Sequence, residues 1–496
     1  MINLVKASQY CELRRGCAVE SQTFEDDSMI VGYTDSDAIQ RTLKCRWFIG
    51  ADGKKGVVRK KFLEPEAGIK QDVGKYSYEG TWVAANLQIT PPTPASHPQL
   101  PFWELGMTSD EVCDLYWPKG WHFCTPPGKA TACGLFGPYK DRNWRHEFAE
   151  PDWHDSMDAE ALFWEHITPM ITRWETSDGR SFSEGLLMFP RDCIAILRCR
   201  PFVFVQKCVN KWFDKRRVLI GDSAHVFPPF GGEGMSSGLR DAHQLAWRIT
   251  LAEKVPGIPD TAVTKLLDGW EAERKRGISD AVTFTKINGM LCNEPESWGF
   301  WVFRHLEYLY KMLPVSLQAT NSRTLKEAKG YRGVKGGSFL SEFNGGGKLA
   351  QAFVQSCSQQ AFRSDGLLGC SESLFTLLVV ESDDTTRYSK ALLSLEKSHL
   401  PAAILSSESM VCVARGGKMG SANTSDQKLE HRIFRTTDHV QDIVGNVSNY
   451  SSAPYLDRLG PFTAYALVRP DFYVYALLQH AADLERCLIQ LKAALE

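Results

Sequence analysis

The stretch from Arg217 to Ile249 constrains what this chain can fold into more than any other. It opens with an aliphatic run, Val218–Ile220, which is typical of a buried strand and which Gly221 ends. Asp222 follows at the carboxyl end of that strand, where open α/β sheets bind their ligands. The next segment has little side-chain bulk, since it contains Pro228, Pro229, Gly231, Gly232 and Gly234. The pattern predicts a strand, a carboxylate and a glycine loop in that order.

A helix is predicted directly after this loop. Its apolar residues recur at helical spacing and indicate one buried face, made of Met235, Leu239, Ala242, Leu245, Ala246 and Ile249. Ser236 or Ser237 is placed to cap its amino terminus. A helix start offers free N–H groups and partial positive charge, and glycines let a ligand approach the backbone closely. With the carboxylate of Asp222 beside it, the stretch suits a cofactor with a hydroxylated chain and an end that becomes negative, as in reduced flavin.

This ordered combination resembles the Gly-Asp motif of the FAD-dependent aromatic hydroxylases, the class A flavoprotein monooxygenases. A tight strand-to-helix turn that binds nothing is also rich in glycine, but the ordered combination is far more specific than a glycine pattern alone. The resemblance implies that the carboxylate binds the flavin ribityl chain and that the loop and helix start face the isoalloxazine ring. The residues that it places at the cofactor are Asp222, Gly221, Pro229, Gly231, Gly232, Gly234, Met235 and Ser236. The family usually has Asn where this chain has Ser236, which still offers a hydroxyl and a backbone N–H.

A second motif lies far upstream. A predicted strand over residues 44–49 ends in Gly-Ala-Asp-Gly, and residues at helical spacing follow it. Alone, this is a common turn. Ahead of a Gly-Asp motif, it resembles the family's Asp-Gly motif, which contributes to both FAD and NAD(P)H handling. The resemblance puts Asp52 and Arg59 at the anchor positions of that motif, while Gly56 stands where the family commonly has Ser.

The family begins with a strand, a Gly-x-Gly-x-x-Gly turn and a helix, which together bind the ADP diphosphate. No Gly-x-Gly-x-x-Gly occurs in this sequence. Roughly the first hundred residues of the family domain are therefore expected to be absent. Three explanations stay open: a truncated gene model, a chain completed by another polypeptide, and a degenerate enzyme. As written, we expect the chain to bind FAD weakly and to leave apolar surface uncovered.

Residues 75–140 are rich in aromatic and β-branched side chains, with turn signals between them. They predict several antiparallel strands, and strand-like residues return at 193–213. In the resembling family this sheet covers the flavin and forms the substrate pocket, so we expect a substrate sheet over about residues 75–205. Aromatic residues serve cores first. His122 and Tyr116 are therefore pocket candidates only.

A run of glycines between Gly330 and Gly347 predicts a flexible connection. We therefore divide the chain into an FAD-binding monooxygenase domain over residues 1–328, a glycine-rich linker over 329–349 and a final domain over 350–496. Before the linker, Trp270-Glu-Ala-Glu-Arg274 resembles a structural segment in the helix that closes the family's FAD domain.

The final domain predicts strands at Leu374–Val380 and Ala402–Leu405, a helix at Asp384–Lys397, a hairpin around Arg469-Pro-Asp and a last helix with an apolar stripe. That order resembles the thioredoxin-like domain appended to phenol and hydroxyphenylpropionate hydroxylases. No Cys-x-x-Cys is available from Cys357, Cys370, Cys412 and Cys487. We therefore expect a packing or dimer-forming role rather than a redox one.

Composition excludes several other classes of function. The 496 residues carry a net charge of −2, which gives no electrostatic argument for nucleic acid as a partner. No apolar run approaches the roughly 20 residues of a membrane span. The 14 cysteines are scattered without a Cys-x-x-Cys pair, which is typical of reduced thiols in a cytoplasmic protein and gives no metal-ligand spacing.

Together these observations predict an α/β protein. It has an incomplete FAD-binding Rossmann-like domain, an inserted antiparallel substrate sheet and a carboxyl-terminal thioredoxin-like domain. The resemblance implies an FAD-dependent monooxygenase that uses NAD(P)H and O₂, through a flavin C4a-hydroperoxide, to hydroxylate an aromatic or phenolic small molecule. No residue stands out as a catalytic base. The alternative is a non-catalytic relative that has lost tight FAD binding and serves as a binding protein.

Overall fold

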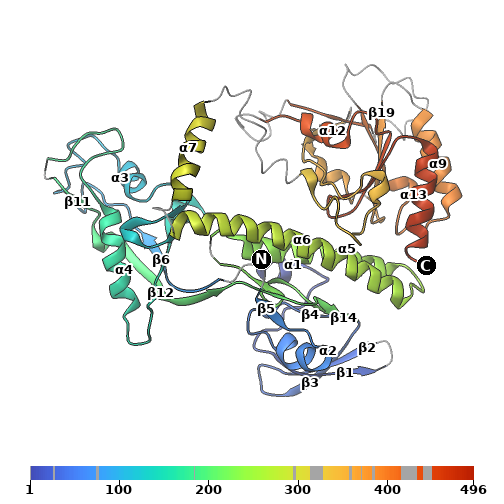
Figure 1. Ribbon diagram of the computed structural model, residues 1–496, viewed down its shortest axis with the longest axis horizontal. Helices are drawn as coiled ribbons and strands as arrows, with labels where there is room; N and C mark the ends of the chain where they lie inside the picture. Colours follow the sequence, from blue (N-terminus) through green and yellow to red (C-terminus); the bar gives the residue numbers. More distant parts are fainter. Residues whose placement is uncertain are drawn as a thin grey trace. The chain divides into compact units, whose positions relative to one another are not determined.

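Figure 1 shows a computed structural model of the chain. It describes residues 2–25, 28–73, 78–183, 185–228, 230–293, 298–312, 328–356, 360–369, 371–381, 386–414, 433–438 and 450–496. The chain divides into two compact units. The first unit is Met1–Ser237 with Ser279–Met312, and the second is Gly238–Ile278 with Leu313–Glu496. Two long helices, α5 (Glu233–Lys254) and α6 (Asp260–Asn293), contribute residues to both units.

The first unit contains the predicted antiparallel sheet. Its five strands run in the order β12 (Ile194–Val205), β6 (Glu79–Ile89), β9 (Asn143–Ala149), β8 (Thr131–Leu135) and β7 (Trp121–Cys124). Side chains alternate between the two faces of a strand, so Arg145 and Glu147 of β9 share one face while His146 and Phe148 share the other. The His146 face packs against α3 (Ser109–Tyr116) and α4 (Ala159–Ile167) in one buried core.

A short parallel pair brings the two sequence motifs together. Strand β15 (Arg217–Leu219) pairs in parallel with β4 (Phe48–Gly50), and β14 (Phe213–Asp214) lies antiparallel on the far side of β15. Leu219 stands opposite Gly50, so the Asp-Gly turn and the Gly-Asp turn leave the same edge of this small sheet. The predicted strand over 44–49 is in fact two strands, because β3 (Gln40–Cys45) ends before β4 begins.

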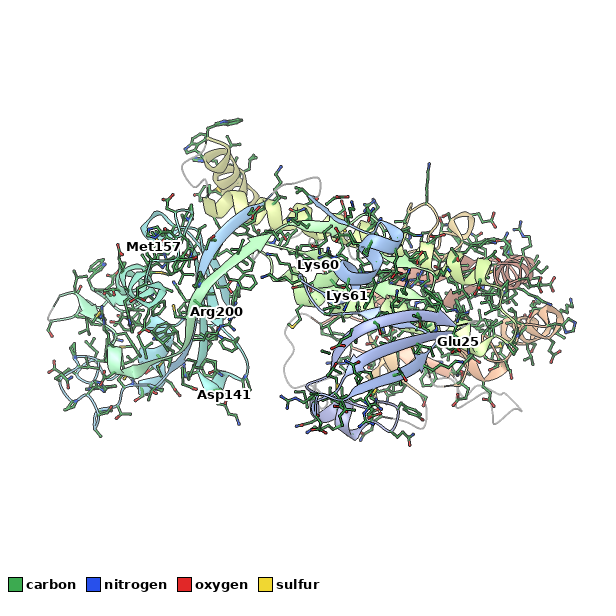
Figure 2. The ribbon with its side chains drawn as sticks, turned by 90° about the horizontal axis from the view of Figure 1, so that it is seen from below. Glu25, Lys60, Lys61, Asp141, Met157 and Arg200 are labelled. Carbon is green, nitrogen blue, oxygen red and sulfur yellow. The ribbon has the colours of Figure 1, made fainter. Side chains whose placement is uncertain are left out.

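The remaining elements of the first unit are small. Strands β1 (Ala18–Glu25), β2 (Ser28–Thr34) and β3 form an antiparallel sheet, and β16 (His225–Val226), β13 (Lys207–Val209) and β5 (Gln71–Val73) form another. A π-helical turn over Val58–Leu63, which includes Lys60 and Lys61 in Figure 2, continues into α2 (Glu64–Ala67). The others are α1 (Ile2–Ala7), β10 (Thr172–Arg173), β11 (Leu187–Met188) and α7 (Trp298–Met312).

Helix α5 begins four residues earlier than a cap at Ser236 requires. It starts at Glu233, so Ser236 lies inside the first turn, where its hydroxyl donates to the carbonyl oxygen of Glu233 at 3.2 Å. The predicted buried face is also mostly wrong, although Leu245 is buried as predicted. Met235 and Leu239 are 78% and 53% exposed. The face that is buried carries the polar residues Ser237, Asp241, Gln244 and Arg248 beside Leu245 and Trp247.

Buried ion pairs in the second unit explain that polar face. The guanidinium of Arg274 donates to Asp241 at 2.7 Å. Glu273 accepts from Arg248 at 2.9 Å and from Arg469 at 2.7 and 2.8 Å. Burial acts to raise the pKa of Glu273, but Arg469 and Arg248 outweigh it and hold the pKa at about 2. The Glu-Arg segment of α6 is therefore structural, as predicted, because removing either partner would leave a buried charge unpaired.

The second unit is built on a seven-stranded mixed sheet. Its order is β18 (Phe362–Arg363), β17 (Phe353–Gln355), β21 (Ile433–Thr436), β20 (Met410–Ala414), β19 (Thr376–Glu381), β22 (Tyr465–Val468) and β23 (Val474–Leu478). Strands β19, β20 and β21 are mutually parallel, and the other pairs are antiparallel. One core joins β19 to α9 (Thr386–Ser398) and α13 (Ala481–Ala493), and another joins it to α12 (Ala453–Leu459).

Most elements predicted for this unit are present, with one correction. The strand near residue 374, the helix after it, the hairpin around Arg469 and the last helix all form. The strand predicted at Ala402–Leu405 is wrong. Ile404 donates its N–H to the carbonyl oxygen of Pro401 at 2.8 Å, so the chain turns there, and the next strand is β20. Ile404 is apolar because it is buried in the core from a turn.

The glycine-rich segment over 329–349 is folded against the second unit. The N–H of Leu340 donates to the carbonyl oxygen of Tyr475 at 2.9 Å. A Cβ on Gly330 would lie 2.5 Å from the carbonyl oxygen of Gly346, and one on Gly345 would lie 2.2 Å from that of Tyr475. These two glycines therefore allow backbones to approach closely. The boundary at residue 328 stays a prediction, because residues 313–327 lie outside the described ranges.

Two further observations concern the whole described chain. Within the described ranges, no helix has the length and apolar character needed to cross a bilayer. Every cysteine in those ranges is a free thiol, and Cys412 and Cys487 of the second unit are both buried. Cys357 and Cys370 lie outside the described residues.

Candidate active site

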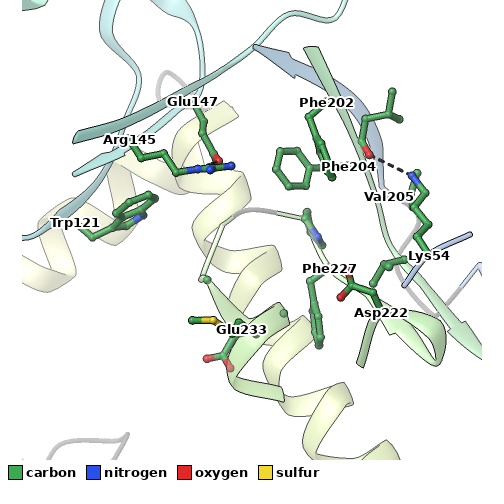
Figure 3. Close-up of a pocket in the computed structure, with 16 residues that line it drawn as sticks. Lys54, Trp121, Arg145, Glu147, Phe202, Phe204, Val205, Asp222, Phe227 and Glu233 are labelled. Carbon is green, nitrogen blue, oxygen red and sulfur yellow. Dashed lines mark hydrogen bonds and ion pairs between the residues drawn. The ribbon is translucent and has the colours of Figure 1, made fainter. Parts of the chain in front are cut away.

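The first unit contains a cavity of about 520 Å³, which we call the first cavity. Its walls come from the Arg145 face of the five-stranded sheet, from the turn after β15 and from the start of α5 (Figure 3). This volume lies within the range of roughly 300–1,000 Å³ that is typical of small-molecule sites. The glycine motif and the antiparallel sheet, which are far apart in the sequence, therefore face a common space.

Asp222 lies at one end of the first cavity. It belongs to a short 3-10 turn, Gly221–Ser223, directly after β15. Its carboxylate accepts no hydrogen bond from any residue that the structure describes, and it points toward the cavity (Figure 3). Desolvation raises the pKa of Asp222, and the charges of His225 and Lys54 oppose that shift. A carboxylate in this position is free to bind a hydroxylated ligand.

Lys54 lies beside Asp222 and was missed by the sequence reasoning. Its ammonium donates to the carbonyl oxygen of Val203 on β12 at 3.2 Å. Desolvation lowers the pKa of Lys54, and the charge of Lys207 adds to that effect. Lys54 directly follows the Asp-Gly turn at the edge that β4 shares with β15. Recognising the two strands as parallel neighbours would have placed it at the cavity.

The start of α5 forms the lower part of the first cavity. Gly232, Gly234 and Met235 all line it. Gly232 has a φ of +61°, and a Cβ built on Gly232 or Gly234 would meet no atom within 4 Å, so the space over this backbone is open. Gly231 lies against α6 instead, where a Cβ would come 3.2 Å from the hydroxyl of Thr285. Of the other residues predicted at the cofactor, Gly221 and Ser236 do not line the cavity, and Pro229 lies outside the described residues.

The structure places Asp52 and Arg59 behind the cavity. Asp52 accepts the backbone N–H of Val58 at 2.9 Å, so it caps the helical turn that follows. A Cβ at position 56 would lie 2.1 Å from the Asp52 carboxylate, which is why glycine stands there. The buried guanidinium of Arg59 donates to the carbonyl oxygen of Lys54 at 2.9 Å. Both residues therefore hold the loop that carries Lys54.

Arg145 and Glu147 line the upper wall of the first cavity, on neighbouring same-face positions of β9. The Arg145 guanidinium donates to the carboxylate of Glu147, and to the side-chain oxygen of Asn86 at 3.2 Å. Burial raises the pKa of Glu147, and Arg145 acts against that shift. Sequence reasoning missed this pair. The sequence held one signal for this pair: along β9 the charged residues Arg145 and Glu147 alternate with His146 and Phe148.

Aromatic side chains complete the wall of the first cavity. Trp121 comes from β7, Phe202 and Phe204 from β12, and Phe227 from the segment after β16 (Figure 3). His122 and Tyr116 do not reach this space. They line a separate cavity on the opposite face of the sheet.

These residues fit the ring end of a flavin. The aromatic walls suit a planar ring, the free carboxylate of Asp222 suits the hydroxyls of a ribityl chain, and the N–H groups at the start of α5 suit an edge that becomes negative. The bare backbone over Gly232 and Gly234 leaves room for close approach. In the described part of the chain, these groups meet in the first cavity.

Comparisons with known proteins agree with this interpretation. A family model described as FAD binding domain matches residues 3–285, more than half of the chain. A probable NADH-specific resorcinol 4-hydroxylase of Rhodococcus jostii is 24% identical over 509 residues, which cover 99% of this chain and 74% of the relative. A 3-(3-hydroxy-phenyl)propionate/3-hydroxycinnamic acid hydroxylase of Klebsiella pneumoniae is 28% identical over 123 residues, covering 25% of this chain and 21% of the relative.

Solved structures agree on the fold. The flavin-dependent monooxygenase PieE, in complex with FAD and substrate, superimposes with a TM-score of 0.56 at 16% identity, covering 97% of this chain and 75% of PieE. Aklavinone-11 hydroxylase, in complex with FAD and aklavinone, gives a TM-score of 0.56 at 16% identity, with 97% and 74% coverage. The resemblance to FAD-dependent aromatic hydroxylases is thus confirmed, and this chain belongs to the FAD-binding domain family.

Proposed function

We propose that this chain is an FAD-dependent monooxygenase that hydroxylates a small phenolic ring with NAD(P)H and O₂. The observation that carries the proposal is the first cavity, which has the flavin-type groups of Asp222 and the α5 start at one end and the Arg145–Glu147 pair at the other. Bound FAD would supply the transfer of electrons from NAD(P)H to O₂. The named activity of the Rhodococcus relative makes NADH the first reductant to test and resorcinol the first substrate.

The substrate end is assigned to the sheet. Trp121 and Phe204 hold the phenolic ring between aromatic walls. Arg145 donates to the phenolic oxygen and orients it. Glu147, whose pKa is raised by burial, accepts the proton of the ring hydroxyl. Loss of that proton makes the ring electron-rich, which favours attack by an electrophilic oxygen. The apolar side chains around the pair exclude water from the reaction.

The finer domain assignment is part of the same proposal. The parallel β4–β15 pair belongs to a Rossmann-like FAD domain over residues 1–328, with 329–349 as its connection to the last domain. Residues 350–496 form a thioredoxin-like domain. Its strand order supports this, since β23, β22, β19 and β20 lie side by side in that order. Strand β20 runs parallel to β19, and β22 runs antiparallel to it. A homodimer and a cytoplasmic location stay predictions. A non-catalytic relative is not favoured, because the named relatives are hydroxylases.

The test is incorporation of ¹⁸O₂. The chain is incubated with excess FAD, NADH and resorcinol, and the product is analysed by mass spectrometry. We expect one labelled oxygen per product molecule and NADH oxidation that depends on resorcinol. Arg145→Gln should lower product formation and leave flavin binding unchanged. Unlabelled product, or no product at saturating FAD with a folded chain, would refute the proposal.

A further inference from the structure

The first unit has a second cavity that the flavin chemistry does not use. It measures about 240 Å³ and lies on the opposite face of the five-stranded sheet, where it is lined by His122 of β7, Cys133 of β8 and His146 of β9. The alternation of side chains along β9 separates it from the first cavity, because Arg145 and Glu147 point to the other face. Its volume is below the roughly 300–1,000 Å³ that is typical of small-molecule sites, so an occupant is limited to about a single ring.

Three N–H donors of its wall have no partner among the described residues. They are the indole Nε1 atoms of Trp117 and Trp144 and the Nε of Arg173. Both tryptophans are at least 97% buried, at 2% and 3% exposure. A buried donor without an acceptor costs about 1–3 kcal/mol. These three atoms are themselves sealed from solvent, whereas the terminal nitrogens of Arg173 are not among the sealed atoms and can meet a ligand in the cavity.

The charge balance of the second cavity points to an anion. Arg173 makes no ion pair with a described residue, and its guanidinium lies 5.8 Å from the ring centre of Tyr116. No described carboxylate lines the cavity. An unpaired guanidinium in a largely aromatic wall favours a planar carboxylate, which accepts two parallel N–H bonds.

A histidine pair adds an acceptor to this wall. His146 Nε2 lies 3.0 Å from His166 Nδ1. On the other side of its ring, His166 Nε2 lies 3.3 Å from the hydroxyl of Thr131. That hydroxyl donates its proton to the carbonyl oxygen of Lys129, so it can only accept from His166. His166 Nε2 therefore carries a proton, His166 Nδ1 accepts, and His146 donates through Nε2. Burial lowers the pKa of His146 to about 3, so its Nδ1 is an unprotonated acceptor at neutral pH.

We propose that the second cavity binds a hydroxylated single-ring aromatic carboxylate. The carboxylate is held by the guanidinium of Arg173, the ring lies among Trp117, Trp144 and His122, and the ring hydroxyl donates to His146. This site is separate from the flavin site and needs no bound flavin.

The test is calorimetric titration of the full chain with 3-hydroxybenzoate, and with 3-hydroxybenzamide as its neutral counterpart. We expect the carboxylate to bind at least about tenfold more tightly than the amide, because only the carboxylate can pair with Arg173. Arg173→Gln should weaken the binding of 3-hydroxybenzoate by about tenfold or more. Arg200→Gln, which removes an exposed arginine of β12 that lines neither cavity, is the matched control and should change nothing.

Circular dichroism spectra that match the parent establish that each variant is folded. Three results would overturn the proposal. One is no binding of 3-hydroxybenzoate to the folded parent, which would mean that water alone occupies the cavity. Another is competition by inorganic phosphate at equal affinity, which would make it a simple anion site. The third is binding that Arg145→Gln abolishes and Arg173→Gln leaves intact, which would place the ligand in the first cavity. Adding or omitting FAD should not alter the outcome, so failure here is distinguishable from failure of the monooxygenase assignment.

Discussion

Replacing Asp222 with alanine should separate flavin binding from folding. The carboxylate is open to the first cavity and accepts no hydrogen bond from a described residue, so its loss removes no intramolecular contact of that kind. We expect the free energy of unfolding to change by no more than about 0.5 kcal/mol. A hydrogen bond between a ribityl hydroxyl and the charged carboxylate contributes about 1.5–3 kcal/mol. The affinity for FAD should therefore fall by at least about tenfold.

The assay is a titration of FAD followed by flavin fluorescence, beside a urea unfolding curve for each protein. Asp52→Ala is the matched comparison, because that carboxylate caps a helical turn behind the cavity. It should lower stability by about 0.5–2 kcal/mol. Its effect on FAD affinity should be smaller than that of Asp222→Ala. Superimposable FAD titrations of Asp222→Ala and the parent, with both folded, would refute the role given to Asp222.

Four further outcomes are expected. Glu273→Gln should destabilise the second unit by about 3–5 kcal/mol in urea unfolding, because two buried arginines lose their charged common partner. The pKa of Glu273 is depressed to about 2. The stability that its carboxylate provides should therefore be lost as the pH falls from about 4.5 toward 2. Burial lowers the pKa values of His146 and His166 to about 3 and 4. Below about pH 6.5 only the unfolded chain takes up these protons, so the first unit should lose stability as the pH falls below that value. His146→Gln should make the stability of the first unit depend less on pH. Glu147→Gln should lower kcat for resorcinol more than it raises KM, and should abolish the rise in rate with pH as that carboxyl ionises. The second unit should show no thiol–disulfide activity in insulin reduction, because Cys487 is buried and burial raises its pKa to about 12.

Local pattern was enough to locate the motifs. The aliphatic run before Asp222 and the strand before Asp52 are both short-range signals. The first strand forms within one residue of its predicted bounds, and the second begins four residues later than predicted. The sequence pattern does not reveal which neighbouring residues each side chain contacts. The two carboxylates resemble each other in sequence, yet one opens to the first cavity and the other caps a turn, since only the path of the chain decides this.

Long-range pairing accounts for the other differences. The buried face of α5 carries Asp241 and Arg248 because their partners come from α6 and from beyond residue 330, which helical periodicity does not reveal. The same limit applies to Arg145 and Glu147. Alternation along β9 separates two faces, but it does not say which face meets the start of α5. The resemblance to a family supplied the chemistry, and the tertiary structure supplied these residues.

We propose that flavin and phenol meet in the first cavity. A crystal structure of the chain grown with FAD and resorcinol tests it most directly. We expect the isoalloxazine ring over the start of α5, a ribityl hydroxyl within hydrogen-bond distance of Asp222, and the phenolic ring against β9 with its oxygen at Arg145. A flavin bound elsewhere, with Asp222 unpaired and the first cavity filled only by water, would contradict it.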